Sequence, residues 1–159
     1  MKTNRKPLLA LDFDGVIHGY DSGWQGAHRI SDPPVPGAGA YLIEALQHFR
    51  VAIFSSRSKS LRGRIAMRAY VRNLLWDAAL ANQDEAEKCW AALSGTPVEY
   101  SPWTLYDVRD LSDQIGAYIE WPWFKPPAAI SIDDRALTFT GNWSDFAPER
   151  LRAFKPWNK

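Results

Sequence analysis

The sequence predicts a single α/β domain built around a mainly parallel sheet. Three short apolar runs, residues 8–13, 51–56 and 128–134, do not alternate with polar residues, which is typical of strands buried on both faces. Residues 38–49 lie between the first two runs and carry apolar side chains at helical spacing. A strand, a helix and a strand in this order form a βαβ unit, whose two strands run parallel.

Length and composition fit one compact domain. The chain has 159 residues, 46% hydrophobic and 23% charged, which supports one core and leaves little room for a second. The net charge of +1 gives no long-range attraction to nucleic acid or membrane. Cys89 is the single cysteine, so no internal disulfide can form, and we expect a cytoplasmic location. The first apolar run is too short for a signal peptide, and no run reaches membrane-spanning length.

The remaining segments predict loops and helices. Residues 15–36 are rich in Gly and Pro and predict a long irregular loop. Residues 60–93 predict two helices, with a break at which Asn82 or Asp84 could cap the second helix. A short helix is expected around residues 110–120, between two loops.

Each predicted strand ends in polar residues. In chain order these are Asp12, Asp14, Ser55, Ser56, Arg57, Asp133 and Asp134. Because the carboxyl ends of parallel strands form one edge of an open α/β sheet, we expect these side chains to share one crevice. Four carboxylates in one crevice need a compensating cation, and oxygen ligands suit Mg²⁺. The expected metal ligands are Asp12, Asp14, Asp133 and Asp134.

Paired carboxylates beside Mg²⁺ fit phosphoryl transfer. Asp12 could attack a phosphoryl group and form an aspartyl-phosphate. Asp14 could protonate the departing oxygen and then accept a proton from the water that hydrolyses the intermediate. Ser55 would hydrogen-bond the phosphoryl oxygens, and a Lys or Arg would balance the charge of the transition state.

The motifs resemble those of the haloacid dehalogenase (HAD) superfamily of phosphotransferases. "LDFDGV" is similar to its first motif, "VAIFS" with Ser55 to its second, and "ISIDD" to its fourth. Lys125 is the best candidate for the lysine of the third motif, and Lys88 is a distant second choice. The resemblance implies a single domain, a Rossmann-like three-layer sandwich with a small or minimal cap. It does not cover residues 15–36, which would form a flap loop, or about 60–124, which would be a helical insertion.

The residue two places after the expected nucleophile favours a phosphatase. The dehalogenases of the superfamily lack an acid at this place and its transport ATPases carry Thr, whereas this chain has Asp14. An Arg follows both "FSS" and "IDD", which is similar to nucleotidases and to the 3′-phosphatase part of polynucleotide kinase-phosphatases. By this similarity Arg57 and Arg135 would contact the substrate phosphate or hold an acid in place. Ser56 is a candidate substrate contact or a turn residue.

We therefore expect a Mg²⁺-dependent phosphatase acting on a nucleotide or a nucleic-acid 3′-phosphate. The alternative substrate is a sugar or another small phosphate monoester. The alternative of another class is a HAD-like domain that binds nucleotide, nucleic acid or protein without catalysis. Arg64, Arg68 and Arg72 would form one stripe on a helix, either a solvated face or a surface that follows phosphates. No membrane partner is expected, and the oligomeric state stays open.

Overall fold

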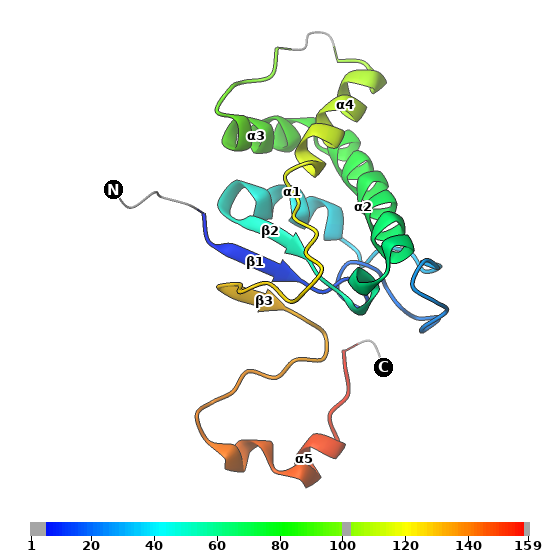
Figure 1. Ribbon diagram of the computed structural model, residues 1–159. Coiled ribbons are helices and arrows are strands. Elements are labelled where there is room, and N and C mark those ends of the chain that lie inside the picture. The colour runs from blue at the N-terminus through cyan, green and yellow to red at the C-terminus, as the bar shows by residue number, and fades with distance from the viewer. Residues whose placement is uncertain (1–5, 100–102, 158–159) are drawn as a thin grey trace.

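The computed structural model describes residues 6–99 and 103–157 and shows an α/β fold with a small parallel sheet (Figure 1). β1 (Leu8–Leu11) is the central strand, between β2 (Arg50–Ile53) and β3 (Ile130–Ile132). Both pairings are parallel. The three predicted strands are therefore confirmed, each shorter than predicted because the polar residues that end the runs lie outside the strands.

The buried residues of the sheet belong mainly to β1 and β2, the two strands that α1 connects. Leu9 lies opposite Val51 of β2 and opposite Ile130 of β3. Leu9 and Val51 are buried, as continuous apolar runs predict. By contrast, Ile130 is 49% and Ile132 38% exposed, because β3 packs mainly against β1, whereas β2 is also covered by α1.

α1 (Ala38–His48) connects β1 to β2 and packs against β2. Gly37 precedes it with a φ of 85°, a left-handed conformation that favours glycine. The buried face of α1 includes Leu42, Ile43 and Leu46, at the spacing that predicted the helix. The βαβ unit is confirmed.

Three further helices form a layer around α1. They are α2 (Leu61–Ala81), α3 (Gln83–Ser94) and α4 (Leu105–Gly116), which pack against one another, while α2 and α3 also pack against α1. The break in residues 60–93 lies at Asn82, whose side chain accepts a hydrogen bond from the N–H of Glu85 (3.2 Å) and caps α3. α4 begins earlier than the short helix expected around residues 110–120.

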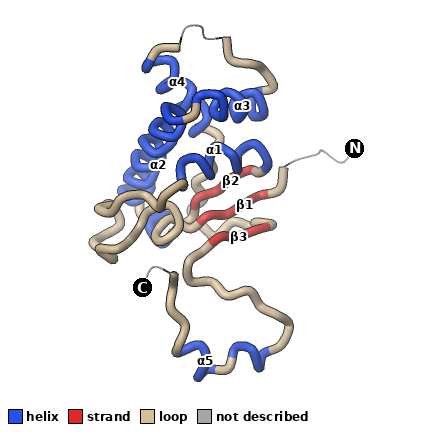
Figure 2. The backbone as a smooth tube through the Cα atoms, turned by 180° about the vertical axis from the view of Figure 1, so that it is seen from behind, coloured by secondary structure: helices blue, strands red, loops and turns tan. Residues whose placement is uncertain are grey.

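The chain after α4 runs along the outer edge of β2. Glu120 donates its N–H to the carbonyl of Val51 (2.8 Å) and accepts from the N–H of Ile53 (2.9 Å). Its carboxylate also pairs with Arg50 at 2.8 Å. Residues 121–129 then cross the face of the sheet opposite α1 to reach β3 (Figures 1 and 2). In the described parts of the chain this second face carries no helix, so only two of the three expected layers are present.

The C-terminal segment extends away from the sheet on the β3 side (Figure 1). It contains the 3₁₀ turn η2 (Trp143–Phe146) and the short helix α5 (Pro148–Arg152). Its end returns to the body, where the indole N–H of Trp157 donates to the carbonyl of Gly15 at 2.9 Å. Within residues 6–99 and 103–157, every helix is too short or too polar to cross a bilayer.

Candidate functional site

Asp12 stands where the carboxyl ends of the three strands meet. Its N–H donates to the carbonyl of Ile132 (2.9 Å), which ties it to the end of β3. On the other side the N–H of Phe54, which follows β2, donates to the carbonyl of Leu11 (3.0 Å). Parallel pairing thus brings the polar residues after the strands to one edge of the sheet, as expected.

Asp12, Asp133 and Asp134 form an acidic cluster at this edge. Each offers one carboxylate oxygen, and these oxygens all lie within 4.8 Å of one another. The side chain of Asp134 is 0% exposed, and neither of its oxygens has a hydrogen-bond partner. The Nε of Arg135 lies 3.5 Å from Asp134 Oδ2. Arg135 offsets one negative charge, but three converging carboxylates leave more, and a buried carboxylate without hydrogen bonds is costly, so the cluster fits a divalent cation with oxygen ligands.

The cluster disfavours a negative charge on Asp12. The pKa of Asp12 is raised from its ordinary value of 3.8 to about 7, mainly by burial. The N–H of Phe13, which donates to Asp12 Oδ1 at 2.7 Å, opposes this effect. The negative charges of Asp133, Asp134 and Asp14 add to it. A divalent cation among these carboxylates would favour the ionised form of Asp12.

Asp14 is held by contacts of its own. Its two oxygens accept hydrogen bonds from Nε of Arg57 at 3.0 and 2.8 Å, and Oδ1 also contacts Nδ1 of His18 at 2.9 Å. Burial raises the pKa of Asp14, but the hydrogen bonds from His18 and Arg57 outweigh it, and the net effect lowers the pKa. Asp14, expected among the metal ligands, is not one of the three acids whose oxygens converge, and these two donors hold its carboxylate instead.

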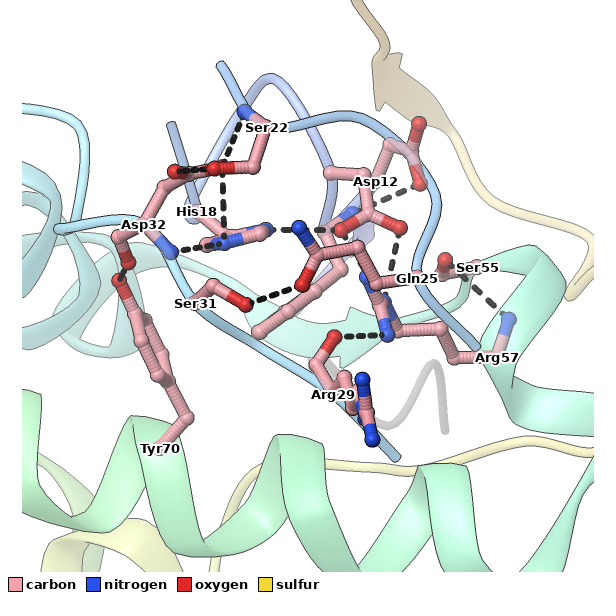
Figure 3. Close-up of polar contacts among 12 residues, drawn as sticks. Asp12, His18, Ser22, Gln25, Arg29, Ser31, Asp32, Ser55, Arg57 and Tyr70 are labelled. Carbon is pink, nitrogen blue, oxygen red and sulfur yellow. Dashed lines mark hydrogen bonds and ion pairs between the residues drawn. The ribbon is translucent and has the colours of Figure 1, made fainter. Parts of the chain in front are cut away.

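Arg57 holds both an acid and a loop in place. Its guanidinium is fully buried, and Nη1 donates to the carbonyls of Gly26 and Ala27, each at 2.9 Å. Nη1 also donates to the carbonyl of Arg29 at 2.9 Å (Figure 3). Nη2 of Arg57 is buried without a hydrogen-bond partner, so the guanidinium exposes no edge to solvent. Of the two roles expected for Arg57, these contacts support holding an acid in place.

Ser55 and Ser56 follow β2, where the 3₁₀ turn η1 (Ser56–Lys59) begins. Ser55 is buried, and its Oγ accepts a hydrogen bond from the N–H of Arg57 (3.4 Å). Its own N–H donates to Oγ of Ser58 (3.1 Å), which completes a capping box. These bonds fix Ser55 at the start of the turn. Ser56 is exposed and lies beside it.

One cleft of about 230 Å³ collects most of the predicted site residues. It is lined by Asp12, Asp14, Tyr20, Phe54, Ser55, Ser56, Lys125, Asp133 and Arg135. A larger cavity of about 390 Å³ lies between α2 and α4, away from the acidic cluster.

The two candidate lysines lie in different parts of the structure. Lys125 reaches the cleft from the 121–129 connection. Lys88 lies on α3, where it pairs with Glu85 at 3.4 Å, and it does not line this cleft. Lys125 is therefore the lysine that the fold places near Asp12.

Sequence reasoning missed the contact of His18 with Asp14. The side chain of His18 is 1% exposed, whereas a residue of a Gly- and Pro-rich loop is usually on the surface. A tight turn after β1 produces this burial, because the carbonyl of Phe13 accepts hydrogen bonds from the N–H groups of Ile17 and His18, both at 2.9 Å. The four-residue spacing of Asp14 and His18 is the only sequence signal for the pair, and it is weak.

Comparison of the chain with protein-family models, with curated protein sequences and with solved structures finds no match.

Proposed function

We propose that this protein is a Mg²⁺-dependent phosphomonoester hydrolase that forms an aspartyl-phosphate on Asp12. One observation carries the proposal: three carboxylate oxygens converge at the ends of β1 and β3, and Asp134 is buried there without a hydrogen-bond partner. A hard divalent cation satisfies such a set of ligands, and when bound it would polarise a phosphoryl group and offset its charge. The resemblance of the three strand-end motifs to those of the HAD superfamily supports the same chemistry.

In the proposed reaction Asp12 is the nucleophile, and Asp14 donates and accepts the proton. An oxygen of Asp12 attacks phosphorus, the ester P–O bond breaks, and the departing oxygen takes a proton from Asp14. A water molecule then attacks phosphorus and gives a proton to Asp14, while the bond between phosphorus and the Asp12 oxygen breaks. Inorganic phosphate leaves, and the carboxylate of Asp12 is restored. The lowered pKa of Asp14 keeps it ionised in the free protein. A phosphate dianion bound beside it adds negative charge and favours the protonated form that the first step needs.

Ser55 and Lys125 are placed to stabilise the transferring phosphoryl group. The Oγ of Ser55 accepts from the N–H of Arg57, so its own O–H remains available to donate into the cleft that it lines. The ammonium of Lys125 and the guanidinium of Arg135 supply positive charge at the same cleft. Ser56 is proposed as a substrate contact because it is exposed at this cleft.

For the substrate we propose a nucleotide or a nucleic-acid 3′-phosphate. Tyr20 lines the cleft, and its ring lies 5.4 Å from the guanidinium of Arg135. Trp123 lies on the same connection as Lys125 and stacks with Arg64 at 4.0 Å. Aromatic rings combined with cations are typical of surfaces that bind bases and phosphates.

A Rossmann-like HAD core with a small cap belongs to the same proposal, with residues 15–36 as flap and about 60–124 as insertion. The flap loop is tied to the site through the bonds of Arg57 to its carbonyls. The lining of the cleft includes no residue of α2, α3 or α4 in the part of the chain that the structure describes. Such an open cleft supports large substrates as well as small ones.

Phosphate release from p-nitrophenyl phosphate, with Mg²⁺ and with EDTA, tests the reaction. We expect turnover that needs Mg²⁺ and that Asp12→Asn abolishes. Asp84→Asn is the matched control, because Asp84 is an exposed acid on α3, and it should retain wild-type turnover. A wild type that is as inert as Asp12→Asn with every divalent metal would overturn the proposal in favour of a non-catalytic binding domain.

A panel of substrates tests the substrate class. It should contain 3′-phosphorylated oligonucleotides, mononucleotides and sugar phosphates, and kcat/KM should be highest for one of the first two classes. Higher values for sugar phosphates would reassign the enzyme to small metabolites and would leave the proposed reaction intact.

A further inference from the structure

The ring of His18 connects the proposed proton-transfer residue to the loop that surrounds it. Nδ1 of His18 lies 2.9 Å from Oδ1 of Asp14. On the opposite side of the ring, the backbone N–H of Asp32 donates to Nε2 at 3.0 Å (Figure 3). The side chain of His18 is almost fully buried, so these two contacts are made away from solvent.

The two contacts determine where the ring carries its proton. A backbone N–H can only donate, so Nε2 of His18 must accept and carries no proton. In the neutral ring the proton then resides on Nδ1, which donates it to the carboxylate of Asp14. The N–H of Asp32 therefore selects the tautomer that makes His18 a donor to Asp14.

Aromatic neighbours fix the plane of the ring. Phe13 stacks on His18 with a ring separation of 5.7 Å and an interplanar angle of 23°. Tyr70 of α2 meets it edge-on at 5.6 Å, and its hydroxyl donates to the carbonyl of Asp32 at 3.0 Å. The residue that sets the tautomer is thus itself anchored to α2.

Two donors from different segments are needed to fix the carboxylate of Asp14. Arg57 contacts both oxygens through one atom, Nε. A carboxylate bound through a single donor atom can still turn about the bond to its Cβ. The second donor, His18, approaches Oδ1 from another direction and removes this freedom.

We propose that His18 is a positioning residue that holds the carboxylate of Asp14 in the orientation required for proton transfer to the departing oxygen. The inference rests on the proposed phosphatase reaction. In this proposal His18 touches neither substrate nor metal. Its effect is limited to one step, the departure of the leaving group.

A matched pair of substitutions separates this role from packing. His18→Asn and His18→Gln both remove the ring and its contacts with Phe13 and Tyr70. The amide nitrogen of Asn can take about the position of Nδ1 and donate to Asp14. The longer Gln places its amide near the position of Nε2, where it can accept from Asp32 but leaves Asp14 without the donor.

The readout is the ratio of kcat/KM for p-nitrophenyl phosphate to that for glycerol 2-phosphate. Nitrophenolate departs without a proton, whereas the alkoxide of glycerol needs one, so only the second substrate depends on a well-placed Asp14. In His18→Gln the ratio should rise about tenfold, the usual effect of losing a partner that orients a site residue. In His18→Asn it should stay within about threefold of wild type, because the donor is restored. Equal ratios in the two variants would overturn the inference.

A second measurement does not depend on activity. Nitrogen-15 spectra of the histidine side chains of the wild type should show His18 protonated at Nδ1 and not at Nε2. A ring protonated at Nε2 and not at Nδ1 would refute the positioning contact. If no phosphomonoester is hydrolysed by the wild type, the proposed function fails, and this spectrum still decides whether His18 donates to Asp14.

Discussion

Replacing Asp12 by Asn should stabilise the metal-free protein, and the gain should grow with pH. The pKa of Asp12 is raised from 3.8 to about 7, mainly by burial, so its negative charge is disfavoured in the folded state. Because the unfolded chain loses this proton first, the stability of the wild type falls as the pH rises from about 4 to about 7. A pKa difference of one is worth about 1.4 kcal/mol, so the full cost approaches about 4 kcal/mol above pH 7. About 2 to 3 kcal/mol of it develops between pH 5 and pH 8.

Urea unfolding in the presence of EDTA measures this effect. Wild type, Asp12→Asn and the control Asp84→Asn are compared at pH 5 and at pH 8. The advantage of Asp12→Asn over wild type should be larger at pH 8 by about 2 kcal/mol, while the control stays within about 0.5 kcal/mol of wild type at both pH values. An advantage of equal size at the two pH values would refute the raised pKa, and one that shrinks would refute its sign.

Three further predictions concern the metal, the buried arginine and the cleft lysine. Since Mg²⁺ needs Asp12 ionised, calorimetry should show about tenfold weaker binding at pH 6 than at pH 8, and equal affinities would contradict the assignment of Asp12 as a ligand. Arg57→Lys should lower the free energy of unfolding by about 3 kcal/mol, because an ammonium cannot serve Asp14 and three carbonyls together; unchanged urea unfolding would count against this. Lys125→Ala should reduce kcat/KM for phosphomonoesters by about tenfold or more, whereas Lys88→Ala on α3 should change it by less than about twofold. Equal effects of the two lysine variants would exclude Lys125 from the site.

Local patterns in the sequence were sufficient to predict the elements of the fold. Continuous apolar runs predicted the three strands, and helical spacing predicted α1. The capping side chain at Asn82 marked the boundary between α2 and α3. These features depend on residues close together in the chain, which is why they can be recognised without the tertiary structure. The ends of the strands were less well predicted, because the apolar runs continue to Phe13 and Phe54, beyond the strand ends at Leu11 and Ile53.

Part of the lining of the cleft could also be predicted from the sequence. Parallel strands bring their carboxyl ends to one edge, so the meeting of Asp12, Ser55 and Asp133 followed from the order of the elements. The sequence did not show which lysine lines the cleft, because the position of Lys125 depends on how the connection from Glu120 crosses the sheet. Pairing of Glu120 with β2 starts that connection at the edge strand and leads Lys125 to the cleft.

The sequence by itself determined that acids would follow two of the three strands, since local patterning suffices for that. Only the tertiary structure decided what surrounds each acid: Asp134 is enclosed without a hydrogen-bond partner, whereas Asp14 is held by Arg57 and His18. The physical reason is that burial and hydrogen-bond partners come from segments far apart in the chain. Two aspartates of one short motif therefore acquire opposite pKa shifts, upward for Asp12 and downward for Asp14.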